Sequence, residues 1–293
     1  MTSPKQPIDT HRVPDVASPI RLQDYAVGIF DQVPTRKGIK KAIKKGLVHV
    51  NSEKGFTGTY IRGGELLELY PDVSTHKPVI SLALQVLFED DHLAVIHKPA
   101  GILVSGRKRF TVENALAHNL TKSRATDAMA HPLPVHRLDY PTTGALLIAK
   151  TASCLRALKT DFEQQRITKE YIAVVSGYPA RQGRINVCVD DKESLSEFNR
   201  LAFVNSEKYQ RLNLLQLHPH TGRRHQLRQH LSRIGCPIFG DLKYGKQGMI
   251  SRSNGLYLHA ASLEFTHPVG NSTIVVKAPW PKKFVKLFPE SQY

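Results

Sequence analysis

The clearest helical pattern in the chain lies between residues 36 and 47. Apolar residues at Ile39, Ala42, Ile43 and Leu47 fall on one arc of a helix, and Gly46 is a natural helix stop. The rest of this helix is basic and carries Arg36, Lys37, Lys40, Lys41, Lys44 and Lys45. The pattern next predicts a short strand over 47–51 and a turn at 62–65 before an apolar stretch at 66–69.

Beyond residue 85 the pattern is mostly that of strands. Residues 86–96 predict two strands joined by an acidic turn, and 145–149, 171–175 and 212–217 predict further strands. Helical spacing appears at 153–165 and 223–234. Strands outnumber helices and the connections are short. The chain therefore predicts an α+β protein with a mixed, mainly antiparallel sheet, flanking helices and a small α/β domain at its N-terminus.

Changes in composition along the chain predict its domain boundaries. Residues 1–14 are polar and contain proline, so we expect a disordered tail. A small basic domain is expected over 15–75, a linker over 76–84 and a large domain over 85–293.

Charge narrows the class of partner. Lys and Arg total 41 against 25 Asp and Glu, a formal charge of +16 that implies a polyanion such as nucleic acid or an anionic membrane. No apolar stretch reaches the roughly 20 residues that span a bilayer, and residues 1–19 lack the apolar core of a signal peptide. The three cysteines form no CxxC pair. These features favour a reduced, cytoplasmic protein without a membrane partner.

The basic helix over 36–45 has two readings. A lysine-rich helix is often a solvated face that keeps a protein soluble. Such faces usually mix both signs of charge, whereas no acidic residue lies between Asp31 and Glu53. We therefore favour phosphate binding by this helix.

The most informative segment is HRLDYPTTG at residues 136–144. It places the carboxylate of Asp139 beside Arg137 and a turn rich in Pro, Thr and Gly, directly before the apolar run at 145–149. Such an entry into a buried strand is a rigid support for a reactive group. On spacing alone, an Asx-turn or cap is the commoner role of such an aspartate.

The segment HRLDYPTTGALLIAKT resembles the central motif of the RluA family of pseudouridine synthases. Matching segments follow the family's order: HKPAG at 97–101, KEYIAVVSG at 169–177, TGRRHQLRQH at 221–230 with GCPIFGD at 235–241, LHA at 258–260 and FTHP at 265–268. Departures are Thr143 in place of the usual Ser, and no His soon after Gly101. Residues 34–69 also resemble the small RNA-binding domain first known from ribosomal protein S-four.

The resemblance implies an enzyme that isomerises uridines in RNA to pseudouridine and acts on a base flipped out of its stack. Asp139 would be the catalytic residue and Arg228 its ion-pair partner, gripping the carboxylate through two parallel bonds. Tyr171 would stack on the target base and lie close enough to move a proton. Taken without the resemblance, Arg228 reads as a structural ion pair and Tyr171 as core packing.

The same resemblance assigns residues to RNA binding and to support. Arg137 would fill the space that the flipped nucleotide leaves, and Arg223 and Arg224 would bind RNA. His136, His225 and Gln226 would support the site, the histidines by donating hydrogen bonds. The reaction changes no oxidation state and releases no atom, so no cofactor is implied. A metal is disfavoured because His225 and His230 are not at the i, i+4 spacing of a helical metal pair.

Two other functions remain open on the sequence. One is a non-catalytic RNA-binding or ribosome-assembly factor that uses the same basic surface. The other is an Asp-based hydrolase of glycosidic bonds, although such enzymes usually pair two carboxylates and the Asp139 motif has one. Ribosomal RNA is the favoured substrate and transfer RNA the next, and a monomer is expected. Attack on the sugar, elimination through a glycal and addition to the uracil ring all remain possible routes.

Overall fold

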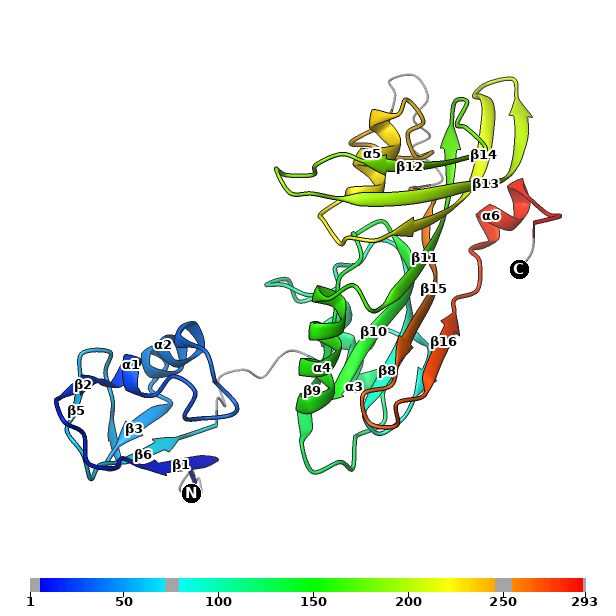
Figure 1. The fold of residues 1–293 in the computed structure, drawn as a ribbon. Coiled ribbons are helices and arrows are strands. Elements are labelled where there is room, and N and C mark those ends of the chain that lie inside the picture. The colour runs from blue at the N-terminus through cyan, green and yellow to red at the C-terminus, as the bar shows by residue number, and fades with distance from the viewer. Residues whose placement is uncertain (1–5, 72–78, 246–254, 292–293) are drawn as a thin grey trace. The chain divides into compact units, whose positions relative to one another are not determined.

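A computed structural model of the chain describes residues 6–71, 79–245 and 255–291 (Figure 1). The chain divides into two compact units, residues 1–77 (unit 1) and 78–293 (unit 2). No helix within the described ranges is both long and apolar enough to span a membrane.

The described part of unit 1 forms a four-stranded sheet, a two-stranded sheet, two helices and its own core. Its elements are β1 (Asp9–Arg12), β2 (Ile20–Arg21), α1 (Leu22–Tyr25), α2 (Arg36–Lys44), β3 (Val48–Val50), β4 (Glu53–Lys54), β5 (Tyr60–Ile61) and β6 (Leu66–Leu69). The main sheet has the order β1-β6-β3-β4, and β2 pairs with β5. Helix α2 buries Ile39, Ala42 and Ile43 in the core, as its periodicity predicted. The hydroxyl of Thr35 caps its N-terminus by accepting from Gly38 N at 3.1 Å.

The expected disordered tail over 1–14 is wrong for the residues from Asp9 onward. Strand β1 pairs antiparallel with β6, with Asp9 opposite Leu69, and Val13 is buried. Backbone hydrogen bonds to β6 hold this polar strand, so its composition gave no sign of order. Residues 1–5 of the expected tail lie outside the described residues.

The expected linker over 76–84 is also corrected at its C-terminal end. Ile80 and Leu84 are buried against α3 of unit 2, and Leu84 N donates to the side chain of Asn119 at 2.7 Å. Residues 80–84 therefore pack as part of unit 2. Residues 76–78 lie outside the described residues.

The described residues of unit 2 are built on one sheet of ten strands. Its elements are β7 (Gln85–Glu89), β8 (Leu93–Lys98), α3 (Val112–Asn119), β9 (Ala128–Pro134), β10 (Thr143–Thr151), α4 (Ala152–Glu163), β11 (Thr168–Ser176), β12 (Gln182–Asn186), β13 (Leu195–Ser206), β14 (Gln210–Pro219), α5 (Gln226–Arg233), β15 (Leu258–Thr266), β16 (Thr273–Lys277) and α6 (Lys282–Leu287). The path runs β12-β13-β14-β11-β15-β10-β8-β7, with β16 beside β15 and β9 beside β10. Among the described strands, only β10 and β15 pair in parallel, so the expected mixed, mainly antiparallel sheet is confirmed.

Strand β10 is buried on both faces, which explains why it reads as a continuous apolar run. Leu146 and Ile148 face the cluster that contains α3, whereas Ala145 and Leu147 face the cluster that contains α4. At its start, Gly144 has a φ of +116°, and a Cβ there would lie 2.1 Å from the carbonyl oxygen of Ala260. Glycine thus lets β15 approach β10 closely, immediately after the Asp139 turn.

The long strand β13 was missed because its alternation is interrupted. Its register against β14 shifts between Arg200 and Ala202, and much of the strand is partly exposed. One extra residue in β13 reverses which side chains point to each face of the sheet. The alternation of apolar and polar residues therefore does not continue through the strand.

Candidate active site

A pocket of about 430 Å³ opens in unit 2 where the Asp139 turn meets the segment that begins α5. We call it the Asp139 pocket. Its lining includes Arg137, Asp139, Tyr171, Arg223, Arg224, His225, Gln226 and Arg228, and it also includes Phe162, Glu163 and Lys169. With His136, which also lines it, nine residues singled out from sequence, spread from position 136 to 228, therefore line one cavity.

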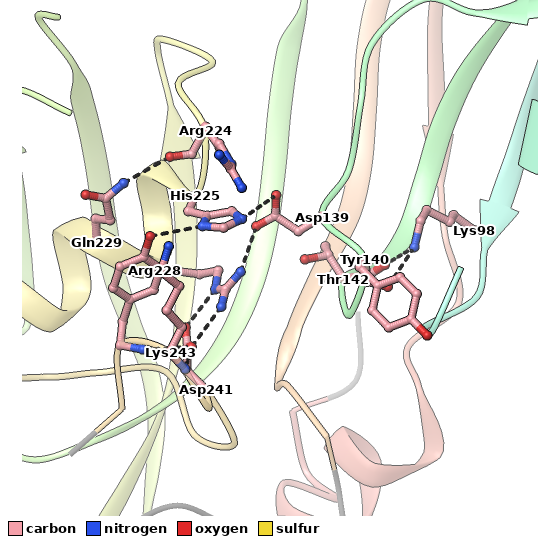
Figure 2. A network of polar contacts seen from close by, with 11 residues as sticks. Lys98, Asp139, Tyr140, Thr142, Arg224, His225, Arg228, Gln229, Asp241 and Lys243 are labelled. Atoms are coloured by element: carbon pink, nitrogen blue, oxygen red, sulfur yellow. Dashed lines mark hydrogen bonds and ion pairs between the residues drawn. The ribbon is translucent and has the colours of Figure 1, made fainter. Parts of the chain in front are cut away.

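Asp139 lies on the turn that connects β9 to β10, and its side chain is 14% exposed. Figure 2 shows His225 and Arg228 reaching its carboxylate from the same side, from the segment that contains α5. Arg228 Nη1 lies 3.3 Å from Asp139 Oδ2, and His225 Nε2 lies 3.7 Å from Asp139 Oδ1. Both contacts are long for hydrogen bonds, so the carboxylate is oriented while its oxygens stay available to a reactant.

Arg228 forms the expected ion pair with Asp139, but it makes its two parallel bonds to Asp241. Its Nε donates to Asp241 Oδ2 at 2.7 Å and its Nη2 to Asp241 Oδ1 at 2.9 Å. Burial alone would lower the pKa of Arg228, but its hydrogen bond to Asp241 and the charges of Asp241 and Asp139 raise it. Arg228 therefore stays charged and joins a buried carboxylate to one that faces the pocket.

Asp241 itself is fully buried and well satisfied. Its Oδ1 also accepts from the backbone N–H groups of Lys243 and Tyr244, at 2.9 and 3.0 Å. Burial would raise the pKa of this carboxyl, but the bond from Arg228 and those backbone donors lower it. In the sequence, Asp241 stands at the end of the matched segment GCPIFGD, and no role was expected of it.

His225 occupies an unusual backbone conformation, with a φ of +55°. The expected helix over 223–234 consequently starts three residues late, at Gln226, because His225 takes the N-cap position in the left-handed region. Its Nδ1 lies 3.0 Å from the hydroxyl of Tyr244. Burial lowers the pKa of His225 more than the neighbouring Asp139 charge raises it. This fits a neutral ring that accepts from Tyr244 and turns an N–H toward Asp139.

Gln226 and His136 hold backbone segments in place. Gln226 Oε1 accepts from Thr221 Oγ1 and Arg223 N, and its Nε2 donates to Leu195 O, so the segment before α5 is tied to β13. His136 Nε2 accepts from Leu147 N at 3.1 Å, so at this nitrogen the ring accepts where a donor was expected. Burial lowers the pKa of His136 to about 3, which keeps the ring neutral.

Tyr171 lines the pocket from β11 and packs against two of the core clusters. Burial, with the nearby charge of Asp139, raises its pKa well above the usual tyrosine range. Its phenol therefore stays protonated at neutral pH and can donate a hydrogen bond, but it is a poor base. Of the proton-moving roles that the family resemblance implied, Tyr171 is therefore suited to donating a hydrogen bond and not to acting as a base.

Lys98 is the main residue that sequence reasoning missed. It lies at the end of β8, fully buried, and its Nζ donates to Pro99 O at 2.9 Å, Tyr140 O at 3.2 Å and Thr142 O at 2.9 Å. Figure 2 shows it on the opposite side of the Asp139 turn from Arg228. A single lysine ending an apolar strand was the available signal, because a buried lysine needs partners.

Activity is expected to fall as the pH rises through about 8, because burial lowers the pKa of Lys98 to about 8 and a neutral amine has too few hydrogens for three carbonyls. Stability should move the other way. The unfolded chain keeps this proton up to about 10.5, so between the two values it binds more protons and the contribution of Lys98 to the free energy of unfolding rises. The check is the pH profile of kcat/KM beside thermal unfolding. Unchanged activity across this range, or loss of structure in step with activity, would contradict the prediction.

The remaining basic residues that were predicted to bind RNA are divided between the two units. Arg137, Arg223 and Arg224 are exposed at the Asp139 pocket. The six basic residues of the 36–45 segment lie on unit 1, where Arg36 pairs with Asp24 at 2.6 Å. The local charge pattern did not predict this ion pair, because Asp24 lies 12 positions before Arg36.

The histidines near the pocket have other partners than a metal. His230 is fully buried in α5 and bonds Ser194 Oγ, Ser196 Oγ and Val187 O within 3.0 Å. His225 points instead to Tyr244 and Asp139. Over the described part of the chain, no three His, Cys, Asp or Glu side chains gather as a metal site would require.

Comparison with known proteins gives the class of the chain. Residues 92–233 match the RNA pseudouridylate synthase family. The tRNA pseudouridine synthase C of Haemophilus ducreyi is 36% identical over 234 residues, which cover 71% of this chain and 95% of that protein. The solved human RNA pseudouridylate synthase domain containing 4 superposes with a TM-score of 0.56 at 23% identity, over 69% of this chain and 90% of that one, and so shares its fold.

A second relative matches nearly the whole chain. The ribosomal large subunit pseudouridine synthase D of Xylella fastidiosa is 29% identical over 301 residues, which cover 94% of this chain and 90% of that protein. The chain belongs to the RNA pseudouridine synthases, which are isomerases. Within that class its relatives make it an RluA-type enzyme, as its motifs predicted.

Proposed function

We propose that the chain isomerises uridines of ribosomal RNA, with Asp139 as the nucleophile acting on a base flipped into the Asp139 pocket. The observation that carries this proposal is the position of the Asp139 carboxylate. Arg228 and His225 lie 3.3 and 3.7 Å from its oxygens, and Tyr171 lines the same pocket. The arrangement offers a reactive anion, a fixed cation behind it and an aromatic face for a base.

The chemistry matches what these residues can supply. Isomerisation breaks the bond from the sugar to a uracil nitrogen and forms a bond to a uracil carbon, while one proton leaves that carbon and one is taken up by nitrogen. No atom is lost, so an enclosed space in which the detached base can turn is the main requirement. A pocket of about 430 Å³ falls within the usual range for small-ligand sites. Asp139 serves each of the three candidate routes as a charged carboxylate.

Access requires the target uridine to leave its stack. Arg137 is exposed at the pocket, two residues before Asp139. We propose that its side chain takes the place of the extruded nucleotide, while Arg223 and Arg224 bind the adjoining phosphates.

The share of this chain that each relative matches supports ribosomal RNA as the substrate. Four relatives named for the ribosomal large subunit match over 88–94% of this chain, whereas three named for tRNA match over 67–71%. Unit 2 begins at residue 78, so a match of 94% must take in much of unit 1. Unit 1 is therefore shared with the ribosomal group, and we propose that it is an RNA-binding domain of the S-four type.

Charge reversal of Lys37, Lys41 and Lys44, each to Glu, is expected to weaken RNA binding. The slope of log Kd against log salt concentration should become shallower by up to about one for each phosphate contact that is lost. These residues lie on the exposed face of α2, so folding should be unaffected. The measurement is Kd against salt concentration. The matched control reverses Lys159, Lys282 and Lys286, which are exposed on unit 2. Equal losses of RNA affinity in both triple variants would contradict a specific role of α2 in RNA binding.

The experiment that tests the proposed function is a map of pseudouridines in total RNA from cells with and without the gene. A discrete ribosomal site should disappear on deletion and return with the wild-type gene, but not with Asp139→Asn. A lost site in transfer RNA would move the substrate to the second choice. Loss of no site in any RNA would favour the non-catalytic binding role.

A further inference from the structure

The end of the sheet beyond α5 carries a row of aromatic and basic side chains that the Asp139 pocket does not use. The row lies toward the tip of the β13–β14 hairpin and next to the segment that follows β11, and Figure 1 shows the backbone of both. Two of its aromatic side chains are unusually open for their size: Tyr178 is 69% exposed and Phe203 is 51% exposed. We call the row of Tyr178, Arg211, Phe203 and Arg200 the hairpin ladder.

Alternating cation–ring contacts build the hairpin ladder. The guanidinium of Arg211 lies 3.7 Å from the centre of the Phe203 ring and 5.7 Å from that of Tyr178. Arg200 lies 5.9 Å from the same Phe203 ring and donates to Pro179 O at 2.9 Å, next to Tyr178. The contacts fix the rings and the guanidinium planes without covering the exposed ring surfaces.

The polar atoms beneath the ladder are not all satisfied. Arg211 Nε is buried and has no hydrogen-bond partner among the described residues, and neither has Asn213 Oδ1, two residues along β14. A purely structural cluster would be expected to pair such atoms.

We propose that the hairpin ladder is a second RNA-binding surface that stacks unpaired bases of the strand flanking the target. The choice of RNA as the partner rests on the proposed function. The ladder combines the two features of single-strand sites, open aromatic faces and fixed positive charge. Arg181 and Lys208, at the edges of the ladder, add to its positive charge, against one acidic residue, Glu207, at the hairpin turn.

The position of the ladder fits a flanking strand. Tyr171, in the pocket, pairs across the sheet with Leu217, and Arg211 lies six residues from Leu217 along β14. At about 3.3 Å per residue, the ladder is about 20 Å from the pocket. Arg211 and Leu217 are an even number of residues apart on one strand, so their side chains point to the same face of the sheet. One strand of RNA can therefore reach both places.

The test compares a target stem-loop with the same RNA extended by a single-stranded flank of about ten nucleotides. Tyr178→Leu and Phe203→Leu are each expected to weaken binding of the extended RNA about tenfold and to leave binding of the short RNA unchanged. Tyr178→Phe keeps the ring and should bind as wild type. Val275→Ala, at an exposed apolar position on β16, is the control for surface change.

A photoreactive uridine placed in the flank gives an independent readout on the wild-type protein. Crosslinks to the segments around Tyr178 and Phe203 would support the proposal. Crosslinks elsewhere, or equal losses of affinity for the short and extended RNAs, would overturn it, and so would unchanged affinity in both Leu variants. Isomerisation of the same RNA is measured in parallel. If the wild-type protein binds the flank through the ladder but forms no pseudouridine, the proposed function is contradicted and this inference is not.

Discussion

Asp139→Asn is expected to lower the rate of uridine isomerisation at least about 10³-fold while leaving RNA affinity nearly unchanged. The amide has the same shape as the carboxylate and can keep a contact with Arg228, which lies 3.3 Å away. It cannot supply the negative charge that every candidate route requires. The measurement is a single-turnover rate with purified protein, beside Kd for the same RNA.

The pocket offers a matched control for this variant. Glu163 also lines the pocket, but it is exposed at the end of α4, and Glu163→Gln removes one negative charge from the same cavity. Its rate is expected to stay within about tenfold of wild type. Full activity in Asp139→Asn would rule out the assigned role of Asp139. Release of free uracil that depends on both carboxylates would instead favour a glycosidic hydrolase, which typically needs such a pair.

Asp241→Asn is expected to lower kcat about 10- to 100-fold with a smaller change in KM, although Asp241 is buried and lines no part of the pocket. Asp241 takes two bonds from Arg228 and thereby sets the angle at which Nη1 meets Asp139. An amide can accept only one of the two bonds and would leave Arg228 free to turn fully toward Asp139. The Asp139 carboxylate would then form a close ion pair with Arg228, and its oxygens would no longer be available to a reactant.

Arg228→Lys separates this positioning role from a merely structural one. Lysine keeps the charge but has no planar fork, so it should reproduce the kcat defect of Asp241→Asn. If Asp241 acts through Arg228, the double variant should be no worse than the more damaged single variant. Additive losses of rate, or losses of rate that follow losses of thermal stability, would show that the buried pair supports the fold alone.

Much of this site could be predicted from the sequence because its residues stand in short, dense segments. The 136–144 segment and the 221–230 segment each bring several pocket residues together, and the resemblance of both to one family joined them before any contact was known. The α2 helix was predicted for a different reason. Its buried residues recur at helical spacing, and that period depends only on neighbours along one element.

The partners of those residues could not be predicted in the same way. Arg228 is 89 positions from Asp139, and Lys98 is 44 positions from Thr142. The ion pair of Arg228 with Asp139 was expected correctly, but its two parallel bonds go to Asp241, because Asp139 and Asp241 are equally plausible partners by type. Which of them receives the two parallel bonds depends on where the turn after α5 lies, and no local period records that.

The sequence by itself determined the enzyme class, the mainly antiparallel fold, the basic helix and many of the polar residues that line the Asp139 pocket. Only the tertiary structure decided that Asp241 orients Arg228, that Lys98 holds the turn after Asp139 and that residues 9–12 form a strand. The division has one physical cause. Periodicity and motifs record interactions within a segment, whereas ion pairs, buried lysines and polar edge strands depend on groups that the folded sheet brings together from distant parts of the chain.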